Sequence, residues 1–191
     1  MPDYTFPFPN KELALQELSY DPCYNKIKEE DKTRIVEEAW QKGTDAARTV
    51  WEKYGGEMNF FRIAEKIGLN CYHVNTDYVV GSQRYFSDYI SGQNKINFYT
   101  KSIALWADQN HFTQEQAENL ILSHEYFHVL EWNTLGLTSK LYQVPMVQVG
   151  RLKFGKTGIR ALSEIGAHAF ARTYYELIKK EKTDHADETS I

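Results

Sequence analysis

The chain has 191 residues, 42% of them hydrophobic and 14% aromatic, which is enough for one domain with a buried core. Its formal net charge of -4 and pI of about 5.9 exclude the basic surface typical of nucleic-acid-binding proteins, so direct binding of DNA or RNA is not expected. No apolar run reaches the roughly 20 residues of a membrane span, and the N-terminus lacks the pattern of a secretion signal, which predicts a cytoplasmic protein without a membrane partner.

The first third of the chain is mainly helical in pattern. Residues 1–10 are rich in proline and phenylalanine and predict an extended arm that packs across the core, with docking to a partner as the alternative. A short helix is expected near residues 11–19 and a longer one from about Lys26 to the pair Gly55-Gly56. Residues 59–66 predict a further helix that ends at Gly68.

The sequence pattern then changes from helical to strand-like. Residues 69–76, 84–90 and 95–100 are rich in Tyr, Phe, Val and Ile, and a Ser-Gly-Gln-Asn turn separates the last two segments. This pattern predicts a small antiparallel sheet. Cys23 and Cys71 are too few and too far apart in sequence for a disulfide framework or a cysteine-based zinc site.

Helical periodicity returns in the second half. Thr113 and Gln116 fit a capping box, so we expect a helix from there to about Trp132, ended by Gly136. Residues 135–158 predict a long loop region, and residues 160–180 predict a last helix. The expected organisation is one α+β domain, with an N-terminal arm and helices (1–58) packed on a core (59–180), followed by a flexible polar tail (181–191).

The segment His124-Glu125-Tyr126-Phe127-His128 is an H-E-x-x-H motif inside the capped helix. Two histidines four residues apart project from one face, one turn apart, so both imidazoles can bind one zinc ion. Glu125 lies one step around the helix, where it can act on a water molecule as general base. The alternative is that His124 and His128 are ordinary polar residues without a metal. A mostly apolar, half-buried helix would then hold two histidines and a glutamate without an evident partner, and burying unpartnered polar groups costs free energy.

A catalytic zinc site needs a third protein ligand and an open position. Glu131 is too far along the helix, at about 10 Å for seven residues, and we expect it to be a supporting or surface carboxylate. The better candidates are Glu164 and His168, which are four residues apart on the next helix among small residues. Either can complete the site while the other supports it. His73, His111 and His185 are predicted not to be ligands.

The HEYFH segment and the later SEIGAHAFA segment together resemble the gluzincin metallopeptidases, and more narrowly the ImmA/IrrE-type family. The family pattern E-x-E-A-N-x-F-A is matched by Glu164, Ala167, Phe170 and Ala171, whereas Gly166 replaces a glutamate and His168 replaces an asparagine. The resemblance covers roughly residues 59–175. It implies a zincin-like fold with Glu164 as the third metal ligand. In the zinc peptidases that the chain resembles, an edge strand shortly before the metal helix receives the substrate, and residues 95–99 occupy the comparable place in this sequence.

The leading hypothesis is therefore a zinc-dependent peptidase that hydrolyses peptide bonds in a cytoplasmic protein, and the resemblance suggests a transcriptional repressor as substrate. The alternative is a metal-binding regulatory or interaction protein without specific proteolysis. A metal hydrolase of small amides is a third option, because H-E-x-x-H marks a mechanism and not a substrate. The candidate donors to a reaction oxyanion are Tyr142, Tyr174, Tyr175 and His168.

Overall fold

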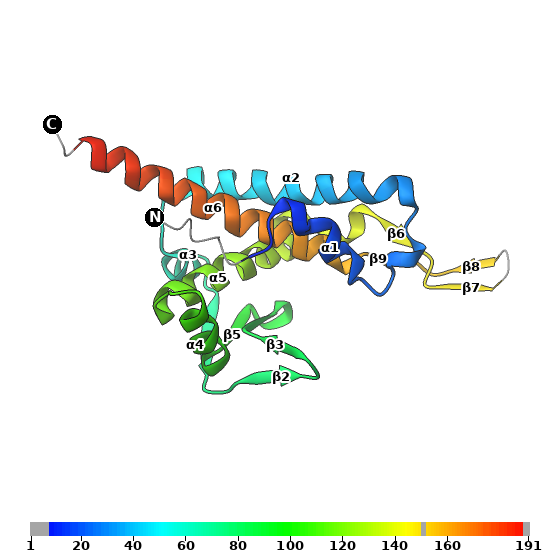
Figure 1. The fold of residues 1–191 in the computed structure, drawn as a ribbon, viewed down its shortest axis with the longest axis horizontal. Coiled ribbons are helices and arrows are strands. Elements are labelled where there is room, and N and C mark those ends of the chain that lie inside the picture. The colour runs from blue at the N-terminus through cyan, green and yellow to red at the C-terminus, as the bar shows by residue number, and fades with distance from the viewer. Residues whose placement is uncertain (1–7, 150–151, 189–191) are drawn as a thin grey trace.

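The computed structural model describes residues 8–149 and 152–188, and it is an α+β structure with small sheets. The two longest helices, residues 29–53 and 160–188, run along the upper part of Figure 1, and the segment of residues 78–109, with helix α4 (Thr100–Gln109), lies in the lower part. Within the described residues, no helix is both long enough and apolar enough to cross a membrane.

The two longest helices, α2 (Glu29–Lys53) and α6 (Arg160–Glu188), pack along each other (Figure 1). Small residues allow this close approach, because a Cβ atom added at Gly43 would overlap the carbonyl oxygen of Gly166. The predicted helix after residue 26 and its stop at Gly55 are confirmed. Helix α6 continues eight residues past its predicted end at residue 180, so residues 181–188 of the predicted tail are helical, and residues 189–191 lie outside the described residues.

The N-terminal elements pack on these helices. The 3-10 turn η1 (Lys11–Leu13) and helix α1 (Ala14–Ser19) form the predicted short helix, which Asn10 caps by accepting a hydrogen bond from the amide of Leu13. A second 3-10 turn, η2 (Tyr24–Lys26), follows. Ala14 and Leu18 are buried in a cluster with residues of α2 and α6, so this region shares its core with the last helix.

Sheet order is β1 (Asn70–Val74), β5 (Lys95–Tyr99), β4 (Ser87–Ile90). The prediction of an antiparallel sheet was wrong for one pair: β4 and β5 are antiparallel, but β1 and β5 are parallel. A separate antiparallel hairpin, β2 (Tyr78–Val80) and β3 (Gln83–Tyr85), lies between β1 and β4 along the chain. Between β4 and β5, the turn η3 (Ser91–Gln93) ends at Asn94, whose φ is +46°.

The sheet is connected to the helices through its central strand. Ile96 and Phe98 of β5 are fully buried, and they pack in a cluster with residues of α3 (Phe60–Lys66), α4 (Thr100–Gln109) and α5 (Gln114–Leu130). Helix α3 was predicted, but α4 was not, because it follows β5 without a loop and has no side-chain cap. The sheet is thereby held beneath α5.

Helix α5 begins with the predicted capping box between Thr113 and Gln116. It ends in one π-helical turn, η4 (Glu131–Leu135), before Gly136 reverses the chain. The predicted loop region then contains one 3-10 turn and four short strands in two antiparallel pairs: η5 (Thr138–Leu141), β6 (Gln143–Val144), β7 (Val147–Val149), β8 (Leu152–Phe154) and β9 (Thr157–Gly158).

Candidate metal centre

Helix α5 holds the two histidines of the motif at the edge of the core. Phe127 and Tyr126 beside them are fully buried and anchor the helix, and the side chains of His124 and His128 are 12% and 17% exposed. The rings of the two histidines meet edge to face, with centroids 5.2 Å apart and planes 77° apart. Both therefore face the same side of α5, as the spacing of the motif predicts.

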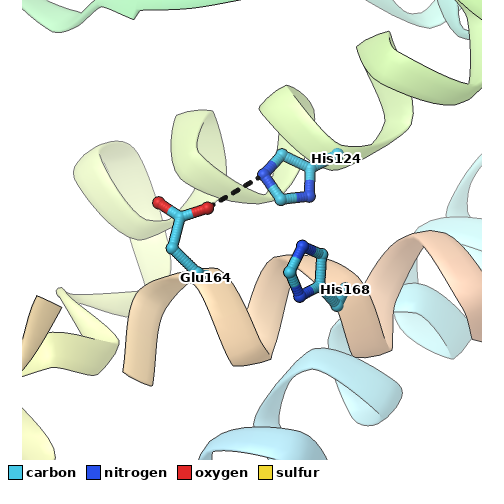
Figure 2. Close-up of side chains that lie close together, drawn as sticks. All are labelled: His124, Glu164 and His168. Atoms are coloured by element: carbon cyan, nitrogen blue, oxygen red, sulfur yellow. Dashed lines mark ion pairs between the residues drawn. The ribbon is translucent and has the colours of Figure 1, made fainter. Parts of the chain in front are cut away.

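Helix α6 supplies the opposing groups. Glu164 Oε2 lies 3.2 Å from His124 Nε2, and Glu164 Oε1 lies 3.7 Å from His128 Nε2. Figure 2 shows Glu164 and His168 pointing from α6 toward His124 on α5. One ligand atom from each of His124, Glu164 and His168 lies within 4.8 Å of the others, so this group could hold a metal ion.

The close approach of the two helices depends on Gly166. A Cβ atom at this position would lie 2.7 Å from two ring carbons of Phe127, closer than real side chains come. A residue larger than glycine at this position therefore requires the buried ring of Phe127 to move. Glu164 and His168 of the same helix are polar groups that face His124.

Glu131 supports His128 from behind. It is 3% exposed, and its Oε2 accepts a hydrogen bond from His128 Nδ1 at 2.9 Å. Its Oε1 accepts two more, from the amide of Thr138 at 2.6 Å and from Ser163 Oγ at 2.9 Å. This carboxylate fixes the tautomer of His128 and directs Nε2 toward Glu164, the arrangement common around histidine ligands.

Glu125 is buried, and its Oε1 accepts a hydrogen bond of 2.6 Å from Ser87 Oγ on β4. Ser87 did not stand out in the sequence, because a lone serine at the start of a strand carries no recognisable signal. The contact ties the sheet to the helix that carries both histidines. It also fixes the orientation of the carboxylate that the motif predicts to be the general base.

The carboxylate and the histidines of the cluster shift one another's pKa values. Burial opposes ionisation of Glu164, but contacts with His124 and His128 outweigh it and hold the pKa of Glu164 well below its ordinary value. Burial would lower the pKa of His128, yet its contacts with Glu131 and Glu164 raise the pKa well above normal. Burial, aided by the charge of His124, lowers the pKa of His168 to about 3, so this ring is neutral near pH 7.

Two cavities flank the cluster, one of about 410 Å³ and one of about 510 Å³. Ser87, His124, Glu125 and Glu164 border both of them. The second cavity also runs along Asp88 and Tyr89 of β4, one of the two edge strands of its sheet. Residues 95–99, which the resemblance compared with a substrate-binding edge strand, form β5 instead, which pairs with β1 on one side and β4 on the other.

Other histidines and tyrosines named from the sequence have different surroundings. His73 contacts Glu118 at 3.1 Å, and the side chain of His185 lies outside the described residues. Tyr174 donates a hydrogen bond to the carbonyl of Glu57, and Tyr142 donates one to Asp31. Neither hydroxyl is available to the cluster in this arrangement. Phe8 and Glu17 also border the smaller cavity, although no motif in the sequence marks them as site residues.

The donor set fits a divalent transition metal. Imidazole nitrogens and a carboxylate are typical zinc ligands. His124 Nδ1 is buried and has no hydrogen-bond partner among the described residues. Burial of a polar atom without a partner costs free energy. No protein-family model, no curated protein and no solved structure matches the chain.

Proposed function

We propose that the protein is a zinc-dependent peptidase, of the gluzincin type that the sequence resembles. The observation that carries this proposal is the convergence of His124, His128 and Glu164 from two helices, beside the buried carboxylate of Glu125. The same donors suit zinc better than calcium or magnesium, which prefer oxygen ligands alone. A bound zinc ion supplies a Lewis acid that activates water and polarises a carbonyl group.

Each protein group then has a distinct task. Glu125 accepts a proton from the attacking water and delivers it to the leaving amine nitrogen. Ser87 keeps the carboxylate of Glu125 in one orientation through its 2.6 Å hydrogen bond. Glu131 keeps His128 Nε2 directed at the metal position. His168, which is neutral near pH 7, is a fourth metal ligand or a hydrogen-bond donor to the developing oxyanion.

The substrate that suits this site is an extended peptide segment. The edge strand β4 contributes Ser87, Asp88 and Tyr89 to the larger cavity, so a substrate strand that adds to this edge runs past Glu125. We propose that the peptidase acts in the cytoplasm on another protein. The resemblance of the sequence favours a transcriptional repressor in that role.

The alternative is a regulator that binds metal without cleaving a specific protein, and one substitution separates the two. Glu125→Gln keeps the size of the side chain and all candidate ligands but removes the base. We expect zinc content to stay the same and peptide hydrolysis, measured by mass spectrometry of a peptide mixture, to be abolished. An unchanged cleavage pattern would rule out Glu125 as base. Glu115→Gln, on the exposed first turn of α5, is the matched control.

The third ligand is tested separately. Glu164 contacts both motif histidines, so Glu164→Ala is expected to lose bound zinc after dialysis. His168→Ala is expected to keep most of it, because His124, His128 and Glu164 remain. Zinc content by atomic absorption distinguishes the variants, and the reverse result would make His168 the third ligand.

A further inference from the structure

The N-terminal segment reaches the metal centre. The ring of Phe8 lies against His124, with centroids 5.5 Å apart and planes 27° apart, and against His168, at 5.8 Å and 25°. Both contacts are stacked, so the ring covers the faces of two imidazoles of the metal cluster. Phe8 and the following Pro9 also border the smaller cavity together with Glu125 and Glu164.

Phe8 is one of four aromatic residues other than histidine that line this cavity, with Tyr85, Phe86 and Trp106. Its ring lies 5.7 Å from that of Trp106 on α4, which in turn lies 5.6 Å from the ring of Phe86 before β4. All three side chains border the cavity of about 410 Å³. Aromatic rings pack favourably against one another, so the part of the cavity beside these rings suits an aromatic or other large apolar side chain.

The anchors of the first helix lie after Phe8 in the chain. The first helical turn begins at Lys11 and is held by its own cap, Asn10, and by burial of Ala14 and Leu18 further along. Loss of the Phe8 ring therefore leaves the contacts of α1 with α2 and α6 in place.

We propose that Phe8 occupies a subsite for an aromatic side chain of the substrate, so that the N-terminal segment competes with substrates for the metal centre. This inference rests on the proposed function and deepens it. A tethered group is present at a high effective concentration, about millimolar for a short linker, so it competes with a free substrate of modest affinity. Substrates that carry an aromatic residue next to the bond to be cleaved displace it best.

The first test measures only whether Phe8 covers the histidines. Metal-free wild type and Phe8→Ala are treated with diethyl pyrocarbonate, and the modification rate of each histidine is followed by peptide mass spectrometry. We expect the rates at His124 and His168 to rise about threefold or more in the variant, since the ring no longer covers them. His73, with a side chain 49% exposed, is the internal control and should not change.

Leu15→Ala, on the exposed face of α1, is the matched variant and should react as wild type does. Equal rates at His124 and His168 in wild type and Phe8→Ala would overturn the proposal. This outcome would leave the proposed peptidase function intact, because the test involves neither metal nor hydrolysis.

The second test measures competition. Calorimetric titration of the zinc-loaded proteins with phenylalanine hydroxamate and glycine hydroxamate compares a metal-binding probe with and without an aromatic side chain. We expect Phe8→Ala to bind the phenylalanine compound about fivefold more tightly than wild type does, with little change for the glycine compound. Equal affinity of both proteins for phenylalanine hydroxamate would overturn the competition, and lack of binding of both compounds would contradict the metal site as well.

Discussion

Two buried carboxylates, Glu125 on α5 and Glu131 at the start of η4, have different surroundings. Glu125 faces the cavities and contacts Ser87, whereas Glu131 lies beneath His128 and accepts three hydrogen bonds. The H-E-x-x-H motif marks Glu125 in the sequence as the candidate base. The distance along the helix was enough to exclude Glu131 as a ligand from the sequence. Its three hydrogen-bond donors come from residues 128, 138 and 163, and a local sequence pattern cannot predict that these residues meet.

Ser87→Ala removes the hydrogen bond to Glu125 without removing the base. A hydrogen bond to a charged group contributes about 1.5–3 kcal/mol, so we expect kcat to fall about tenfold or more, with KM nearly unchanged. Steady-state hydrolysis of a peptide substrate gives both constants. Zinc content should equal that of wild type, and an unchanged kcat would show that Ser87 does not orient the base.

Glu131→Gln keeps the volume of the side chain but not its charge. Substitution of a carboxylate behind a histidine ligand weakens metal binding about 10- to 100-fold, and we expect a loss in this range. Competition with a zinc-chelating dye measures the affinity. Glu115→Gln, on the exposed first turn of α5, should bind zinc as wild type does. Wild-type affinity in Glu131→Gln would contradict the supporting role of Glu131.

At the scale of elements, local patterns predicted α2, α3 and α5 because capping residues and glycine stops mark their ends. The pairing of the sheet was beyond such patterns. Whether β1 lies parallel or antiparallel to β5 depends on the path of the chain through β2 and β3, and the residues of each strand fit either direction. Helix α4 was missed because it follows β5 directly, without a turn signal.

The crossing of α5 and α6 brings the ligands together, and Gly166 sets its distance. Gly166→Ala places a Cβ atom 2.7 Å from the ring of Phe127. Overpacking of this kind costs about 1–3 kcal/mol, which exceeds the gain of about 1 kcal/mol in helix propensity when the helices cannot separate. We therefore expect a lower midpoint in urea and weaker zinc binding.

Gly92→Ala is the control for this comparison. No atom lies within 4 Å of a Cβ added at Gly92, so its stability should change by less than about 0.5 kcal/mol. If Gly166→Ala were as stable as wild type and bound zinc equally well, the helix spacing would not limit the site.

Across the whole molecule, the candidate metal centre lies where parts distant in sequence meet. Helix α5 contacts both β4 and α6, and α6 in turn packs against α1 and α2. Phe8 lies in the same region. From the sequence, the N-terminal arm was expected to pack across the core or, alternatively, to dock a partner. A metal ion bound here bridges α5 and α6, and it should stabilise the molecule as a unit.

Zinc binding is therefore expected to raise the thermal stability. A ligand present at about 100 times its Kd adds about 2.7 kcal/mol to the free energy of unfolding, which corresponds to a rise in Tm of about 5–10 °C for a chain of this length. Differential scanning calorimetry with zinc and with a chelator gives this difference. It should vanish in His124→Ala, and an equal shift in that variant would place the stabilising ion elsewhere.

The most direct test of the central claim is the zinc content of the purified protein and of His124→Ala, measured after equilibration with zinc and removal of free ion. The account predicts one zinc ion per wild-type chain and none in the variant, with circular dichroism showing that both are folded. A wild-type protein without stoichiometric zinc, or a variant that retains it, would contradict the metal centre proposed between α5 and α6.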